Sequence, residues 1–249
     1  MHLRDAFILG LVQGIAEWLP VSSSGHLLIL HHLFGLKGGI SFDIFLHLSS
    51  LLVIIIFFHK DISGIIRALL VWDKKSSHFK WAVYILSATF ITVIAGILLK
   101  PYLEFISIKF LPYTFLFTSV VLFLSAGKRE GSIDMKRALF IGLLQGIALL
   151  PGVSRSGATI SGARITGVKD EDAFRFSFLL AVPAILGAVV YEIKKFEVVP
   201  GSFLLTGFFV SFFTGLGSLY LLKKIVMKGR FYLFGFYTLL LSLLLFFIK

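Results

Sequence analysis

The chain has 249 residues, of which 57% are hydrophobic and only 15% are charged, and its mean hydropathy is +0.96. This composition excludes an ordinary soluble globular domain, and the absence of cysteine excludes disulfides, a thiolate nucleophile and a cysteine-based metal site. We attribute the net charge of +11 to basic loops beside anionic lipid and expect no nucleic acid as a partner.

The first element is a short apolar stretch over residues 6–19, and we expect no cleavable signal peptide before it. This stretch is too short to span a membrane, and Pro20 and three serines follow it at once. Gln13 and Glu17 are four residues apart and share one helix face, and Pro20 ends that helix. A second helix is expected to begin near Ser24 with a serine cap, which predicts a broken hairpin.

The loop of this hairpin combines the groups that anion chemistry needs. Free backbone N–H groups, the hydroxyls around Gly25 and the positive end of a helix form an anion site. His26 lies one turn beyond Ser23, so Glu17, Ser23 and His26 supply a carboxylate, a hydroxyl and an imidazole. Ionisable residues at membrane depth are costly, which makes them functional candidates.

Three apolar spans follow, near residues 42–58, 80–99 and 110–126. Isolated strands cannot satisfy their backbone in lipid, and the alternation of a closed barrel is absent, so we expect helices. Asp43 and His47, four residues apart at the start of the first span, either pack inside the bundle or support the site from behind.

The sequence then repeats itself: residues 10–25 read GLVQGIAEWLPVSSSG and residues 142–157 read GLLQGIALLPGVSRSG. Ten of the sixteen positions are identical. In the second copy they are Gly142, Leu143, Gln145, Gly146, Ile147, Ala148, Val153, Ser154, Ser156 and Gly157. Paired interrupted apolar segments are typical of a polar site at the centre of an inverted-repeat membrane protein.

The two copies differ where their chemistry would differ. Arg155 stands at the position of Ser23, Leu149 at that of Glu17 and Ala158 at that of His26. The second copy therefore keeps an anion-binding shape and gains a guanidinium that can clamp phosphate oxygens. Serine and glycine also line ordinary helix contacts in membranes, but both loops together with their ionisable residues favour a functional site.

Three further spans are expected near residues 172–192, 202–222 and 231–248. Basic residues concentrate in the loops 59–80, 127–137, 164–175 and 223–230, which the positive-inside rule places in the cytoplasm, with both termini outside. Because three spans separate the hairpins, the hairpins enter from opposite sides. The expected fold is a single all-α integral membrane domain over 1–249, with inverted repeats over about 1–127 and 133–249. It has six transmembrane helices and two re-entrant hairpins.

These motifs resemble those of the undecaprenyl-diphosphate phosphatase family, bacterial inner-membrane enzymes also called bacitracin-resistance proteins. The resemblance runs from about residue 3 to the C-terminus. It is carried by Gln13 and Glu17 in a (Glu/Gln)-x-x-x-Glu element, by Leu-Pro-Val-Ser-Ser-Ser-Gly-His over residues 19–26, and by Pro-Gly-x-Ser-Arg-Ser-x-x-Thr over 151–159.

The resemblance implies a multi-pass hydrolase that removes the terminal phosphate of a C55 polyprenyl diphosphate and so recycles the lipid carrier for peptidoglycan synthesis. It also implies a site open to the periplasmic side and a divalent cation, Mg²⁺ or Ca²⁺, near Glu17 and Gln13. Many members carry a glutamate where this chain has Gln13, and a neutral ligand weakens a two-carboxylate metal site.

The mechanism keeps alternatives open at this point. Ser23 or an activated water attacks the terminal phosphorus, Glu17 or His26 is the base, and His26 can also act as an acid on the bridging oxygen. Arg155 holds the phosphoryl charge. The other expected substrate-binding residues are Gln13, Ser22, Ser24, Gly25, Ser154, Ser156, Gly157 and Thr159.

Two other functions are compatible with such a fold. A polyprenyl-phosphate transporter or flippase needs binding groups but no nucleophile, whereas Glu17, Ser23 and His26 occur in one half only, which favours an enzyme. A structural membrane subunit leaves Arg155 unexplained. Membrane lipids surround the chain in each case, and a homodimer is an open alternative.

Overall fold

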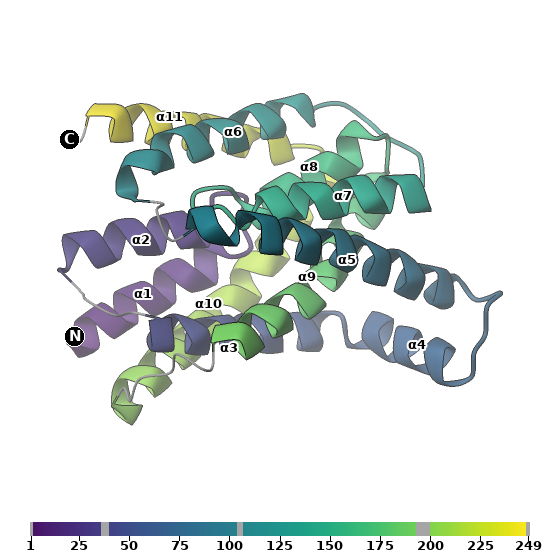
Figure 1. Cartoon of the computed structure of the whole chain (residues 1–249), viewed down its shortest axis with the longest axis horizontal. Helices are drawn as coiled ribbons and strands as arrows, with labels where there is room; N and C mark the ends of the chain where they lie inside the picture. The colour runs from purple at the N-terminus through teal and green to yellow at the C-terminus, as the bar shows by residue number, and fades with distance from the viewer. Residues whose placement is uncertain (1, 36–39, 104–106, 193–199, 248–249) are drawn as a thin grey trace.

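The computed structural model describes residues 2–35, 40–103, 107–192 and 200–247, and these ranges are helical apart from loops and one isolated bridge between Gly131 and Val168 (Figure 1). The helices are α1 (Leu3–Ala16), α2 (Ser23–Leu33), α3 (Ile40–Phe57), α4 (His59–Leu70), α5 (Ser77–Leu103), α6 (Leu111–Leu124), α7 (Met135–Ile147), α8 (Arg155–Ile165), α9 (Asp170–Glu192), α10 (Gly201–Met227) and α11 (Phe234–Phe247). Two 3₁₀ turns, Ile108–Phe110 and Phe231–Leu233, precede α6 and α11.

Each predicted span corresponds to an apolar helix, and the lengths divide these helices into two groups. In the described part of the chain, α5, α9 and α10 are long and apolar enough to cross a membrane. The pair α3 and α4 qualifies only as a broken span, because it bends by 80° at its junction. The helices α6 and α11 are shorter, with 14 residues each. The chain is therefore an all-helical, multi-pass membrane protein.

The region 59–80, which the sequence predicted to be a basic loop, contains the helix α4. Its charged residues Lys60, Asp61 and Arg67 alternate with Ile62, Ile65 and Ile66, which gives an amphipathic helix rather than an apolar one.

The two repeated segments form two helical hairpins, α1 with α2 and α7 with α8. In Figure 1 the first hairpin lies at the end of the molecule that carries both termini, and the second approaches from the other end. Each second helix begins with a serine cap: the N–H of Gly25 donates to Ser22 Oγ at 3.3 Å, and the N–H of Gly157 donates to Ser154 Oγ at 3.1 Å.

Repeated glycines seat each hairpin on a long helix. A Cβ on Gly10 would lie 2.7 Å from the carbonyl oxygen of Gly207 on α10, and a Cβ on Gly142 would lie 2.4 Å from that of Ala88 on α5. The same relation links the loops, because a Cβ on Gly25 would lie 2.9 Å from the Cα of Gly152. Small residues therefore let α1 and α7 pack closely and bring the two loops together.

A buried arginine braces the far end of the second hairpin. Arg164 is 1% exposed and donates to the carbonyl oxygens of Ser125 and Gly127 at 2.9 and 2.8 Å, while it pairs with Asp170. Arg164 was expected in the basic loop 164–175, but it is the penultimate residue of α8 and is buried. Its charge lies inside the protein, where it joins the ends of α6, α8 and α9.

Candidate functional site

The first hairpin brings Glu17 and Ser23 into contact. Glu17 follows the last turn of α1, and Ser23 is the first residue of α2, so the loop between them turns the chain back on itself. The hydroxyl of Ser23 donates to Glu17 Oε2 at 2.6 Å, and both residues are 9% exposed. This is the geometry of a serine nucleophile and its carboxylate base.

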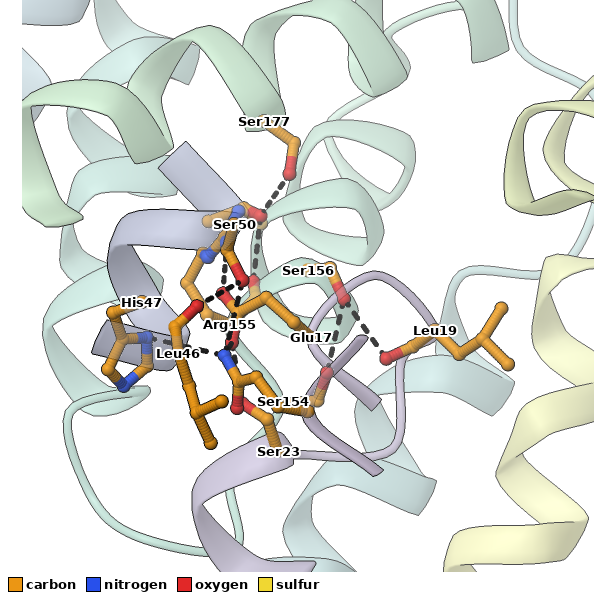
Figure 2. Close-up of polar contacts among 12 residues, drawn as sticks. Glu17, Leu19, Ser23, Leu46, His47, Ser50, Ser154, Arg155, Ser156 and Ser177 are labelled. Carbon is orange, nitrogen blue, oxygen red and sulfur yellow. Dashed lines mark hydrogen bonds and ion pairs between the residues drawn. The ribbon is translucent and has the colours of Figure 1, made fainter. Parts of the chain in front are cut away.

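The second hairpin adds a guanidinium to the same carboxylate. Arg155, the first residue of α8, donates from Nη2 to Glu17 Oε1 at 2.6 Å (Figure 2). Its guanidinium also lies over the ring of Phe178 at 5.6 Å, while its Nη1 is buried without a partner among the described residues. Glu17 therefore links two hairpins that are far apart in the sequence.

Gln13 supports Glu17 from behind. Its Nε2 lies 3.1 Å from Glu17 Oε2, 3.3 Å from Ser50 Oγ and 3.4 Å from His47 Nδ1. The Arg155 guanidinium and the Ser23 hydroxyl both donate to the Glu17 carboxylate, and these contacts stabilise its ionised form.

Glu17, Ser23 and Arg155 line a cavity of about 200 Å³ between the two loops. Its polar lining consists of Glu17, Ser22, Ser23, Ser24, His47, Gln145, Ser154 and Arg155. A water needs about 10–15 Å³ of such volume, so the cavity has room for a phosphoryl group together with waters. The cavity is therefore lined by a serine hydroxyl, a carboxylate and a guanidinium together.

Other predicted site residues lie outside this lining. Gly25 forms the contact between the loops, and the N–H of Gly157 donates to the capping Ser154 Oγ at the start of α8. Ser156 Oγ lies 3.5 Å from the carbonyl oxygen of Leu19, and Thr159 Oγ1 lies 2.6 Å from Ser177 Oγ. The structure thus gives these residues contacts that hold the hairpins in shape.

His26 lies apart from the cavity as well. Its Nδ1 is 2.7 Å from the carbonyl oxygen of Ser22 and its Nε2 is 2.7 Å from the hydroxyl of Tyr237, on the wall of a separate apolar cavity of about 380 Å³. Ser22 has φ 68°, a left-handed conformation that is uncommon for serine. His26 therefore holds the strained residue directly before Ser23.

His47 and Gln145 line the cavity, although the sequence motifs did not assign them to it. For His47 a signal existed, because it is four residues from Asp43 on an apolar helix. For Gln145 the signal was its identity with Gln13 in the other copy.

The donor set does not fit a divalent cation held by Glu17 and Gln13. Both carboxylate oxygens of Glu17 already accept hydrogen bonds, one of them from the cationic Arg155. Gln13 presents its NH₂ group to Glu17, so its oxygen cannot join Glu17 around one ion in this arrangement. Among the described residues, no group of three His, Cys, Asp or Glu side chains could hold a metal.

The similarity of this chain to known proteins extends beyond these motifs. The family described as bacitracin resistance protein BacA matches residues 6–244. A protein named undecaprenyl-diphosphatase from Thermosipho africanus is 38% identical over 247 residues, covering 97% of this chain and 98% of that protein. A protein of the same name from Korarchaeum cryptofilum is 37% identical, covering 98% of this chain and 98% of that protein. Another from Treponema denticola is 38% identical, covering 98% of this chain and 96% of that protein. The similarity therefore includes both hairpins.

Proposed function

Since the chain belongs to the BacA family of bacitracin resistance proteins, it is an undecaprenyl-diphosphatase, and we propose that Glu17, Ser23 and Arg155 form its catalytic centre. The observation that carries this proposal is the pair of 2.6 Å contacts through which Glu17 holds both Ser23 and Arg155. A transporter needs no nucleophile aligned on a base, so this pair also favours an enzyme over a flippase.

In the proposed first step, Ser23 Oγ attacks the terminal phosphorus of the diphosphate while Glu17 takes its proton. The bond from phosphorus to the bridging oxygen breaks and undecaprenyl phosphate leaves, with phosphate bound to Ser23. Arg155 offers its unpartnered Nη1 to the phosphoryl oxygens, where charge spreads as the reaction proceeds. Ser22, Ser24 and Ser154 supply hydroxyls on the same cavity wall.

His26 takes a positioning role in this proposal. Its Nδ1–H donates to the carbonyl oxygen of Ser22, and its Nε2 accepts from the Tyr237 hydroxyl, so both ring nitrogens are engaged. Glu17, rather than His26, is then the base. We expect a His26 variant to lose activity because Ser22 relaxes and Ser23 moves away from Glu17.

For the membrane arrangement we propose six spans and two re-entrant hairpins in inverted repeats, over about 1–127 and 133–249. Broken backbone is tolerated at membrane depth only where protein or water surrounds it, and the two loops surround each other. The proposed location is the bacterial inner membrane, with the catalytic cavity open to the outer side.

The resemblance also implies a divalent cation, and we propose that Mg²⁺ or Ca²⁺ arrives with the diphosphate rather than being held by Glu17 and Gln13. Phosphate oxygens are good ligands for both ions, and Mg²⁺ in particular commonly reaches proteins through substrate phosphates. No catalytic step above passes through the ion.

Phosphate release from undecaprenyl diphosphate by the purified protein in detergent tests the proposal, because detergent abolishes transport but not hydrolysis. We expect Ser23→Ala and Glu17→Gln each to lower kcat by at least about 100-fold. Near-normal turnover by Ser23→Ala would overturn the serine nucleophile, and lipid binding without phosphate release by the wild-type protein would favour the flippase.

A further inference from the structure

Gln145 is a buried polar residue of the catalytic cavity that the steps above do not use. It occupies the position in the second hairpin that Gln13 occupies in the first. Its side chain is 1% exposed and lines the same cavity as Glu17, Ser23 and Arg155.

Thr92 on α5 fixes the orientation of the Gln145 amide. Thr92 Oγ1 lies 3.0 Å from the carbonyl oxygens of both Ala88 and Gly142, so its single hydrogen is directed to one of them. Toward Gln145, 3.2 Å away, Thr92 can only accept. Gln145 must therefore present its NH₂ group to Thr92, and its Oε1 is left without a partner among the described residues.

An unpartnered buried acceptor costs about 1–3 kcal/mol, so a ligand that donates to it is favoured. Phosphate oxygens near neutral pH mainly accept hydrogen bonds and would be repelled by Oε1. A water molecule fits better, because it can donate to Gln145 Oε1, and the Gln145 side chain lines the same cavity as Ser23 and Arg155. In the first copy, Gln13 Oε1 is likewise without a partner among the described residues, but the Gln13 amide nitrogen is directed to Glu17 and Gln13 does not line the cavity.

We propose that Gln145 positions the water that hydrolyses the phosphoserine formed at Ser23, an inference that rests on the proposed function. The water oxygen bonds to phosphorus and the bond from phosphorus to Ser23 Oγ breaks. The proton that Glu17 took from Ser23 returns to the serine oxygen, and both hydrogens of the water leave with the phosphate. Glutamine orients an attacking water in the same way in some phosphoryl-transfer enzymes.

The test is rapid-quench kinetics of the full-length protein in detergent, with undecaprenyl diphosphate labelled in its terminal phosphate. Gln145→Met keeps the side-chain volume and removes the acceptor. We expect kcat to fall about tenfold or more while kcat/KM stays within about twofold, because kcat/KM covers only the steps up to release of undecaprenyl phosphate. Labelled phosphate should accumulate on the peptide that contains Ser23, approaching one per active site.

Two threonines of α5 provide a second variant and its control. Thr92→Val removes the partner of Gln145 and should give the same pattern more weakly. Thr89→Val removes a hydroxyl that donates to the Ile85 carbonyl oxygen one turn earlier, outside the cavity lining, and should leave the kinetics unchanged.

Failure of this inference differs from failure of the proposed function. If wild-type protein shows transient phosphoserine but Gln145→Met lowers kcat and kcat/KM together without accumulating more, Gln145 does not position the water. If neither protein carries phosphoserine at any time, the serine nucleophile is wrong and the inference fails with it.

Discussion

The residues around Glu17 separate what residue types predict about the site from what the conformation of the hairpin loop determines. The sequence predicted that a carboxylate, a serine and an arginine would serve one anion, and the structure places all three on one cavity. It also predicted His26 there, because His26 is one turn from Ser23. In the structure His26 instead contacts Tyr237 and the carbonyl oxygen of Ser22, whose left-handed backbone the residue pattern does not reveal.

The neutral side chain of Gln13 can be tested for its effect on the binding of a divalent cation. In Gln13→Glu, a second carboxylate lies beside Glu17, and the pair attracts a divalent cation more strongly than the wild-type site does. We expect the Mg²⁺ concentration that gives half-maximal phosphate release to fall several-fold. An unchanged or higher requirement would show that the neutral side chain at position 13 is not what keeps Glu17 from holding a cation.

The helix breaks were predictable where glycine, proline and serine determine the backbone conformation. The breaks at residues 20–25 and 151–157 follow from these residue types, and their glycines set the contacts of α1 and α7. The helix α4 was missed because its mixture of charged and apolar residues reads as a basic loop. α4 bends by 80° against α3 and packs on α5, and the sequence displays neither feature.

Arg164 tests the brace at the end of α8. Arg164→Met removes the charge that Asp170 faces and leaves the carbonyl oxygens of Ser125 and Gly127 without their donor. We expect a loss of about 3 kcal/mol in the free energy of unfolding, measured with a denaturant in detergent. Lys169→Met, which alters an exposed cation, should change that free energy by less than about 0.5 kcal/mol. Equal losses of unfolding free energy in Arg164→Met and Lys169→Met would show that Arg164 does not brace this end of α8.

The contact between His31 on α2 and Asp43 on α3 predicts a pH dependence. The Asp43 hydrogen bond raises the pKa of His31 above its ordinary value of 6.5, against the opposing effect of burial. The stabilisation that the contact between His31 and Asp43 gives the folded protein is therefore fully present below pH 6.5, and it is lost as pH rises through the raised pKa of His31. The Tm difference between wild type and His31→Gln in detergent should be larger at pH 6 than at pH 9. It should be small throughout for the exposed neighbour His32→Gln, and a difference for His31→Gln that grows with pH would contradict this account.

At the scale of the whole molecule, the duplication and the distribution of basic loops predict the inverted arrangement. The cysteine-free chain allows a direct test with single cysteines at exposed serines. In intact cells, a membrane-impermeant maleimide should label Ser107→Cys and Ser202→Cys, and it should label Ser77→Cys and Ser132→Cys only after permeabilisation. Labelling of all four in intact cells, or of the opposite pair, would be incompatible with the proposed orientation.

The central claim is that two hairpins from opposite ends of the molecule build one catalytic centre through Glu17. The most direct measurement is a double-mutant cycle on kcat/KM for phosphate release, with Glu17→Gln, Arg155→Met and the double variant. We expect each single variant to lose at least about 100-fold and the double variant to lose little more than the worse single one. If the two losses multiply, Glu17 and Arg155 act independently, and the shared centre does not exist.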